Sequence, residues 1–118
     1  MTIEIYRKRL ETMLTYISEN IELPEGLVEG VKKFLEEGLD NHKNEIEAVT
    51  KKCIAILEKK YTAKKKVLEI SSYFYSLSKM SKFDKSFNYG LVEGYLDDEI
   101  VAQLPIVIGQ CSKILKGE

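Results

Sequence analysis

The sequence has no tryptophan and only two prolines, two cysteines, two arginines and one histidine among its 118 residues. So little proline argues against a loop-rich chain and favours helices. Cys53 and Cys111 lie far apart, and together with one histidine they are too few for a zinc or di-iron site. We expect both cysteines to be buried on apolar helix faces, with a disulfide between them as the alternative. No metal and no cofactor is predicted.

A long apolar run is also missing. The longest one is Leu104 to Ile108, whereas a helix that spans a bilayer needs about 20 residues. The first residues, Met1 to Arg7, lack the charged-then-apolar order of a signal peptide. These features predict that the protein has no membrane partner and is cytoplasmic, and therefore intracellular.

Catalytic motifs are missing as well. The chain has no phosphate-binding loop, dinucleotide fingerprint or nucleophile elbow. Its single imidazole, His42, is expected at the surface near a helix start, and the alternative is a phosphoacceptor on a helical bundle. Phosphotransfer domains follow that histidine with lysine and then glycine, and Lys43-Asn44 departs from this order. The sequence therefore predicts a protein that is not an enzyme.

What the sequence does have is a balanced composition. Hydrophobic residues make up 44% and charged residues 31%, with a net charge of −1. This balance argues against a disordered chain and predicts one domain over residues 1–118. The 16 lysines and 15 glutamates outnumber the four asparagines and two glutamines. Such a bias is typical of hyperthermophile proteins, and an AT-rich genome also produces an excess of lysine over arginine, so both explanations stay open.

Apolar residues recur every three or four positions through most of the chain, which predicts an all-α fold, a single compact bundle of five to six helices. The first helix should run from Ile3 to Ile21 after Thr2 as N-cap, and the second from Pro24 to about Leu39. Asp40 or Asn41 can cap the third helix. Residues 82–96 form a further predicted helix. The last one follows Asp97 or Asp98 as cap and ends at Gly117, and Pro105 either kinks it or starts it afresh.

The middle of the chain allows two arrangements. A 4-3 apolar pattern runs from Val49 to Leu77 and is interrupted only by Lys60. One long helix over about 41–80 would follow this pattern, whereas a break near 60–63 would keep Lys60 out of the core. Because average helices are much shorter than 40 residues and Thr62 can cap a new helix, we favour the break.

The middle of the chain also concentrates positive charge. Residues 51–85 hold 10 basic and 3 acidic side chains, a net of +7, while residues 1–50 carry −5 and residues 86–118 carry −3. Lysines bind phosphate backbones without sequence preference, and Tyr61 or the tyrosines at 73 and 75 could stack on bases. A solvated face neutralised by acidic helices competes with this hypothesis, and arginine, which grips phosphates best, is scarce. The candidate nucleic-acid-binding residues, all within segment 51–66, are Lys52, Lys59, Lys60, Lys64, Lys65 and Lys66.

Seven aromatic residues crowd into positions 73–95. One helix face cannot bury Tyr73, Phe74 and Tyr75 together, so some of these rings should lie exposed or in an interface, where tyrosine is enriched. The alternative is that the tyrosine rings cover the core and keep their hydroxyl groups in water. The leading hypothesis is a non-enzymatic helical interaction, regulatory or assembly protein that binds a protein partner or itself, for example as a homodimer. The alternative is a nucleic-acid-associated accessory protein. The predicted contact residues are Tyr73, Tyr75, Phe83, Phe87 and Tyr89.

Overall fold

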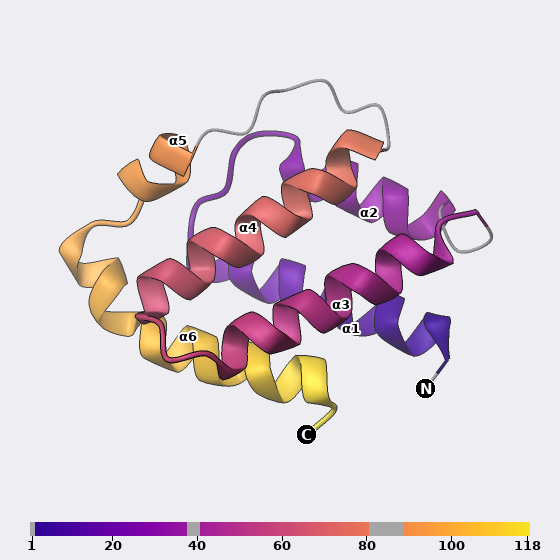
Figure 1. Cartoon of the computed structure of the whole chain (residues 1–118). Helices are drawn as coiled ribbons and strands as arrows, with labels where there is room; N and C mark the ends of the chain where they lie inside the picture. The colour runs from indigo at the N-terminus through magenta and orange to yellow at the C-terminus, as the bar shows by residue number, and fades with distance from the viewer. Residues whose placement is uncertain (1, 38–40, 81–88) are drawn as a thin grey trace.

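The computed structural model describes residues 2–37, 41–80 and 89–118, and these residues form helices without any strand (Figure 1). The all-α prediction is confirmed. None of the described helices is both long and apolar enough to cross a membrane. The helices in chain order are α1 (Ile3–Asn20), α2 (Leu27–Glu37), α3 (Lys43–Glu58), α4 (Ala63–Met80), α5 (Tyr89–Gly94) and α6 (Asp98–Lys116).

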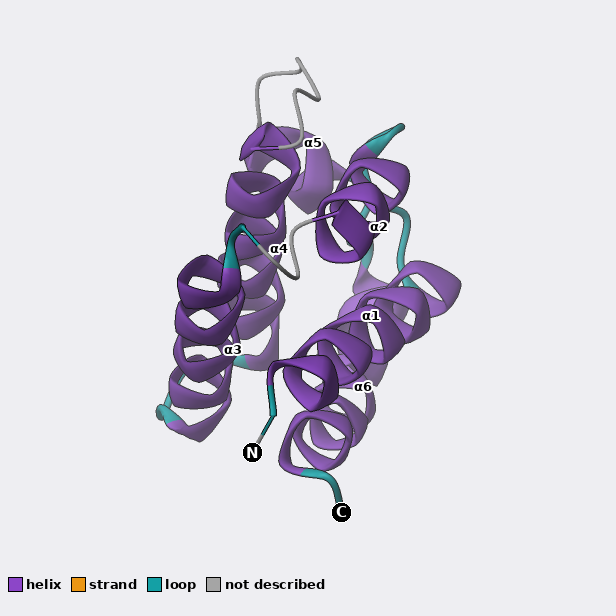
Figure 2. Ribbon diagram, turned by 90° about the vertical axis from the view of Figure 1, so that its right-hand side faces the viewer, coloured by secondary structure: helices purple, strands orange, loops and turns teal. Residues whose placement is uncertain are grey.

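The helices form two layers, seen edge-on in Figure 2. One layer holds α3 and α4 side by side, and the other holds α1, α2 and α6. The short helix α5 packs against α4. Each long helix has one apolar stripe, and the two layers turn these stripes toward one another because burial removes them from water.

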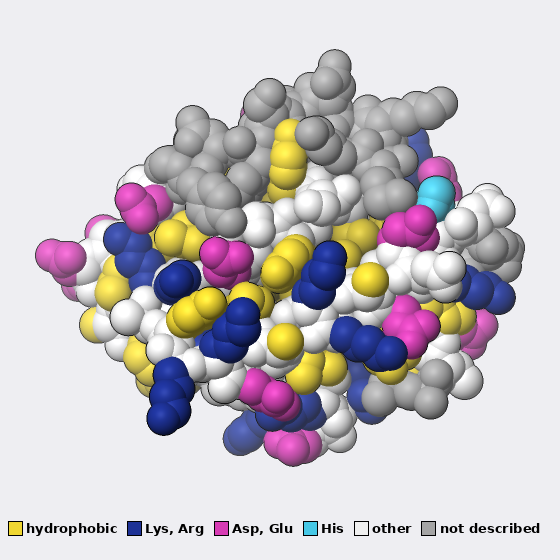
Figure 3. Space-filling model, viewed as in Figure 1, with side chains coloured by type: hydrophobic (Ala, Val, Ile, Leu, Met, Phe, Trp, Pro, Cys, Tyr) yellow, Lys and Arg dark blue, Asp and Glu magenta, His cyan; other side chains and the backbone are white. Residues whose placement is uncertain are grey.

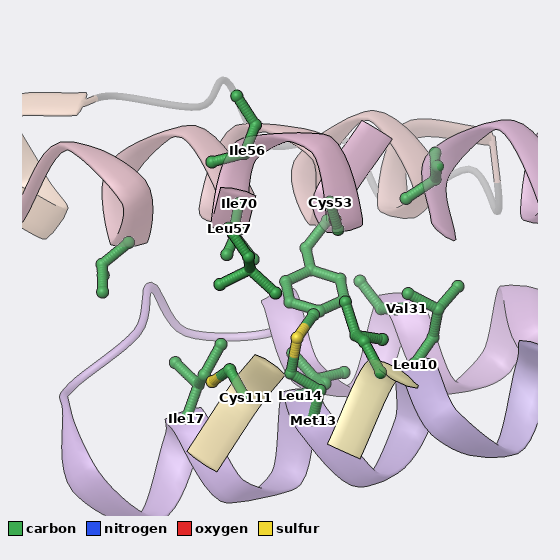
Figure 4. Close-up of a cluster of buried hydrophobic side chains, with 14 of the residues drawn as sticks. Leu10, Met13, Leu14, Ile17, Val31, Cys53, Ile56, Leu57, Ile70 and Cys111 are labelled. Atoms are coloured by element: carbon green, nitrogen blue, oxygen red, sulfur yellow. The ribbon is translucent and has the colours of Figure 1, made fainter. Parts of the chain in front are cut away.

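The core fills the space between the layers. Figure 4 shows side chains of α1 and α3 that point toward one another there, with Cys111 contributed by α6. Phe74 of α4 is among the largest fully buried side chains. One continuous cluster joins buried residues from α1, α2, α3, α4 and α6.

The chain breaks between α3 and α4, as predicted. Helix α3 ends at Glu58, Lys59 adopts an extended conformation, and α4 begins at Ala63. The Thr62 hydroxyl accepts the Lys65 backbone N–H at 3.1 Å, so Thr62 caps α4 as expected. The break leaves Lys60 exposed, whereas one long helix would have placed its charge on the apolar stripe.

Several predicted helix boundaries are wrong. Pro24 does not begin α2, because its carbonyl accepts the N–H of Leu27 in a turn three residues before the helix. The turn is completed by Gly26 at φ 82°, a conformation that favours glycine. His42, not Asn41, occupies the N-cap position of α3. Asp40, the other predicted cap of α3, lies outside the described residues. So do the end of the predicted second helix and residues 82–88 of the predicted helix 82–96.

Helix α6 has well-defined ends. The Asp97 side chain accepts the N–H of Ile100 at 2.9 Å, which confirms the predicted cap. The helix continues through Pro105, so the alternative that Pro105 starts a new helix is wrong. Gly117 ends the helix at φ 75°, as predicted. A Cβ atom on Gly117 would collide with the Arg9 guanidinium, so α1 lies close against the end of α6.

The fold predicts a large loss of stability at one residue of α6 and almost none at another residue two positions away. Leu104 is fully buried, whereas Ile106 is 74% exposed. Leu104→Ala should lower the free energy of unfolding by about 2–5 kcal/mol, because it leaves a cavity in the core. Ile106→Ala should change it by less than about 0.5 kcal/mol in dilute solution. Denaturant titrations of both variants measure the difference, and equal losses would contradict this arrangement of α6.

Candidate interaction surfaces

The side of α6 that faces away from the core carries a second regular stripe. Its members are spaced three or four residues apart and are all exposed, and we call them the α6 outer face: Glu99, Ala102, Gln103, Ile106, Gly109, Gln110 and Lys113. Ile106 lies at the middle and is 74% exposed. Such spacing keeps the seven side chains on one side of a helix over four turns.

Charge on the α6 outer face is confined to its two ends. Glu99 lies in the first turn of α6 and Lys113 in the last, where each charge also matches the helix dipole. Neither side chain forms an ion pair with any described residue. The centre between them is uncharged, and so is the whole segment from Ile100 to Ser112. In a chain with 31% charged residues, this is an unusual composition for an exposed helix face.

A groove between α1 and α6 borders the α6 outer face. It has a volume of about 780 Å³ and shares Gln110 with that face. Its floor and walls include Glu11, Tyr16 and Glu19 of α1. Clustered carboxylates and a tyrosine are the residue types an active site would use, but the Glu11 carboxylate is held by Arg7 at 3.2 Å. The groove is open along the helix pair, so it has the form of a contact surface.

A smaller hollow of about 310 Å³ lies further along the same two helices. Ile5 of α1 and Ile114 of α6 line it, and Lys113 of the α6 outer face lies at its edge. Ile5 is 39% exposed, and among the described residues it and Ile106 are the most exposed large hydrophobic side chains. Both therefore lie on the α1–α6 side of the molecule.

The α3–α4 turn carries the most conspicuous group of lysines. The ammonium groups of Lys59 and Lys65 lie 5.4 and 4.0 Å from the centre of the Tyr61 ring. Lys52 lies 5.8 Å from the centre of the Tyr73 ring. Cation–π contacts of this kind hold the ammonium groups against the aromatic rings. We call Lys59, Lys60 and Lys65, together with Lys52 further back along α3, the turn lysines. None of them forms an ion pair with a described residue.

The other two candidate lysines are already engaged. Lys66 donates to the carbonyl of Leu57 at 2.8 Å, at the C-terminal end of α3 where a positive charge is favourable. Lys64 lies 3.5 Å from Glu93 and joins α4 to α5. Because the helix breaks at residues 59–62, Lys52, Lys59 and Lys66 do not share one stripe of a continuous helix. In Figure 3, basic side chains on the α3–α4 side lie among hydrophobic and acidic ones.

The aromatic segment 73–95 is described only in part. Phe74 is buried at 1% exposure, while Tyr73 and Tyr75 flank it half-buried and pack against the core. This arrangement agrees with the expectation that one helix face cannot bury all three rings. Phe83 and Phe87 lie outside the described residues, and so does the side chain of Tyr89. The predicted contact surface therefore stays a prediction.

His42 lies beside an aromatic ring and a carboxylate. Its ring lies 5.2 Å from the Phe34 ring, centre to centre, and its Nδ1 atom lies 3.8 Å from a Glu45 carboxylate oxygen. The ring contact joins the start of α3 to α2, and the Glu45 contact lies within the first turn of α3. Nothing around this histidine adds support for the phosphoacceptor alternative.

Metal-ligating side chains do not gather within the part of the chain that the structure describes, where no three His, Cys, Asp or Glu residues come together. Cys53 and Cys111 are both free and fully buried. The disulfide alternative is therefore wrong, and the cysteines act as small core residues. Burial raises the pKa of each thiol from 9.0 to about 12, and at Cys53 the neighbouring Cys111 adds to this shift.

Comparisons of this chain with protein-family models, with curated proteins and with solved structures gave no match. Its function has to be argued from its own surfaces.

Sequence reasoning missed the α6 outer face. The signal was present in the uncharged stretch from Ile100 to Ser112, but such a stretch is also typical of a helix that is buried on all sides. A second exposed stripe becomes visible only when the inner stripe of Leu104, Ile108 and Cys111 has been placed against the other helices.

The buried thiols lead to a testable prediction. Cys53 and Cys111 should not react with a thiol reagent in the native protein at neutral pH, because the reactive thiolate is scarce and access is blocked. Both should react as soon as the chain is unfolded in denaturant. A colorimetric thiol assay measures this, and rapid reaction of either cysteine in the folded protein would contradict the burial.

The raised pKa values also determine how these thiols affect stability. Between pH 9 and about pH 12 the unfolded chain loses thiol protons that the folded chain keeps. The stabilisation from the protonated thiols is therefore fully present below pH 9 and is lost as the pH rises through this window. Cys111→Ala should flatten this decline in the free energy of unfolding, and an unchanged slope would contradict the assignment.

Proposed function

We propose that this protein is a non-enzymatic helical interaction or assembly protein and that it makes contact through the α6 outer face. The observation that carries the proposal is Ile106, a large apolar side chain that is 74% exposed at the centre of that face. The centres of protein interfaces are poor in charged residues, whereas their rims are polar. The α6 outer face has this pattern, with an uncharged centre and one charge at each end.

Two further features support the same side of the molecule. The groove between α1 and α6 shares Gln110 with the α6 outer face, and the smaller hollow shares Lys113. Ile5 adds exposed apolar surface at that hollow. Exposed apolar side chains that are rimmed by polar residues are typical of a docking surface. The aromatic segment 73–95 remains a second predicted contact region, and three of its five predicted contact side chains, those of Phe83, Phe87 and Tyr89, are not described.

The proposal predicts that one added charge abolishes binding. Ile106→Glu should remove the contact, because an unpaired carboxylate at an interface centre has to be desolvated. Ala48→Glu adds the same charge at an exposed position of α3 and serves as the control. Capture from native extract with tagged protein, followed by mass spectrometry, measures binding. The number of captured copies of the protein itself is measured as well. A captured protein that is lost with Ile106→Glu and kept with Ala48→Glu supports the proposal. If no captured protein behaves in this way, the proposal is refuted.

Nucleic-acid binding is the second candidate function. The turn lysines favour it, since the exposed side chains of Lys59, Lys60 and Lys65 lie around one helix–helix turn without described acidic partners, and Lys52 lies about two helical turns back along α3. The overall net charge of −1 counts against it. The Tyr61 ring is covered by Lys59 and Lys65, so a base could stack on it only after displacing one of them.

This candidate makes its own prediction. If the turn lysines bind phosphates, replacing Lys52, Lys59 and Lys65 with glutamine should lower the slope of log affinity against log salt by about 3. The matched control replaces Lys8, Lys33 and Lys43, which are exposed elsewhere. Gel retardation of random-sequence DNA and RNA at low salt measures it. No retardation, or equal losses in the two triple variants, would reject nucleic-acid binding at this turn.

We also propose an intracellular, cytoplasmic location. Two free cysteines support it, because reducing compartments keep thiols in this state.

A further inference from the structure

We infer that the partner of the α6 outer face is a second copy of this chain, packed with the two α6 helices antiparallel about a twofold axis at Ile106. The inference rests on the proposed function and names its partner. It is drawn from the symmetry of the residues along this face.

The face is symmetric about its central residue. Glu99 lies seven residues before Ile106, and Lys113 lies seven residues after it. Seven residues are close to two full helical turns, so the three side chains lie on one line along the helix. In a twofold arrangement residue i contacts j and j contacts i, and these positions are the ones a twofold axis at Ile106 would exchange.

The charges are complementary only in the antiparallel direction. Glu99 of one copy then faces Lys113 of the second copy, and the same pair forms again across the axis. Both side chains lack an ion-pair partner among the described residues of their own chain. A parallel pair would instead place Glu99 beside Glu99 and Lys113 beside Lys113. Antiparallel packing also places the positive N-terminal end of each α6 dipole beside the negative C-terminal end of the other, which is favourable.

The sizes of the side chains are complementary as well. Within the same register Gln103 faces Gly109 of the second copy, and Gln110 faces Ala102, so each long side chain meets a small one. A Cβ atom at Gly109 would have no neighbour within 4 Å, which leaves room for the opposing glutamine. Ile106 meets its own equivalent at the axis and is removed from water there.

The contact is small, because one helix from each copy provides its centre. Interfaces at the low end of the size range are weak and transient, so we expect a dimer that dissociates on dilution. The groove residues beside Gln110 and Lys113 add a polar rim.

A charge-swap experiment tests both the partner and the register. Glu99→Lys places lysine against Lys113, and Lys113→Glu places glutamate against Glu99, each twice per dimer. Sedimentation velocity over a series of concentrations should show that each single variant weakens self-association by about tenfold. The double variant E99K/K113E, and an equimolar mixture of the two single variants, should dimerise as the unmodified protein does.

Asp98→Lys is the matched control, since it reverses a charge in the same first turn of α6 but lies off the outer face. It should leave the dimer intact, and circular dichroism checks that every variant is folded. A dimer that is restored by neither the double variant nor the mixture would overturn the antiparallel register.

Failure of this inference can be told from failure of the proposed function. A protein that stays monomeric at every concentration, while Ile106→Glu still abolishes capture of another protein, overturns the second copy as partner and leaves the proposed function standing. A monomer whose captured proteins are indifferent to Ile106→Glu overturns both.

Discussion

Five of the described helices, α1, α2, α3, α4 and α6, have to share one apolar core. This constraint determines which side of each helix remains for function. The chain is short, so each long helix can bury only one stripe, and the two layers are arranged so that these stripes meet. Everything outside the stripes must then be compatible with water or with a partner. On α3 and α4 the outer surface is rich in lysine, which water solvates well. On α6 the corresponding surface has no charge over four turns except at its ends, and this difference is the basis of the functional argument.

The same constraint explains how charge is used inside the fold. Lys66 neutralises the end of α3 by its bond to Leu57, and Lys116 lies 3.2 Å from Glu58 and links α6 to α3. These lysines hold helix ends together at partly exposed positions, where an ion pair contributes little on its own. The basic middle of the chain is therefore partly structural. What it leaves for binding is the smaller group at the α3–α4 turn, whose ammonium groups rest on Tyr61 and Tyr73.

Periodicity in the sequence was sufficient for the fold class, for the core stripes and for the break at residues 59–62, because Lys60 cannot be buried and Thr62 can cap a helix. It failed at boundaries such as Pro24 and Asn41, where a turn closed by Gly26 and a cap at His42 depend on how neighbouring helices pack. It also failed at the outer face of α6. Ile106 belongs to an apolar run that could be entirely core, and only the packing of Leu104 and Ile108 shows which members of that run face outward.

The central claim is that a second copy covers Ile106. The most direct measurement mixes protein carrying isotope-labelled isoleucine methyl groups with unlabelled protein, and records nuclear Overhauser contacts that pass only between the two. The antiparallel dimer predicts contacts from the Ile106 methyl groups to α6 of the unlabelled copy, at Ile106 itself and at the residues one turn to either side. Contacts from Ile106 to any other helix, or their absence at concentrations where the protein is dimeric, would contradict it.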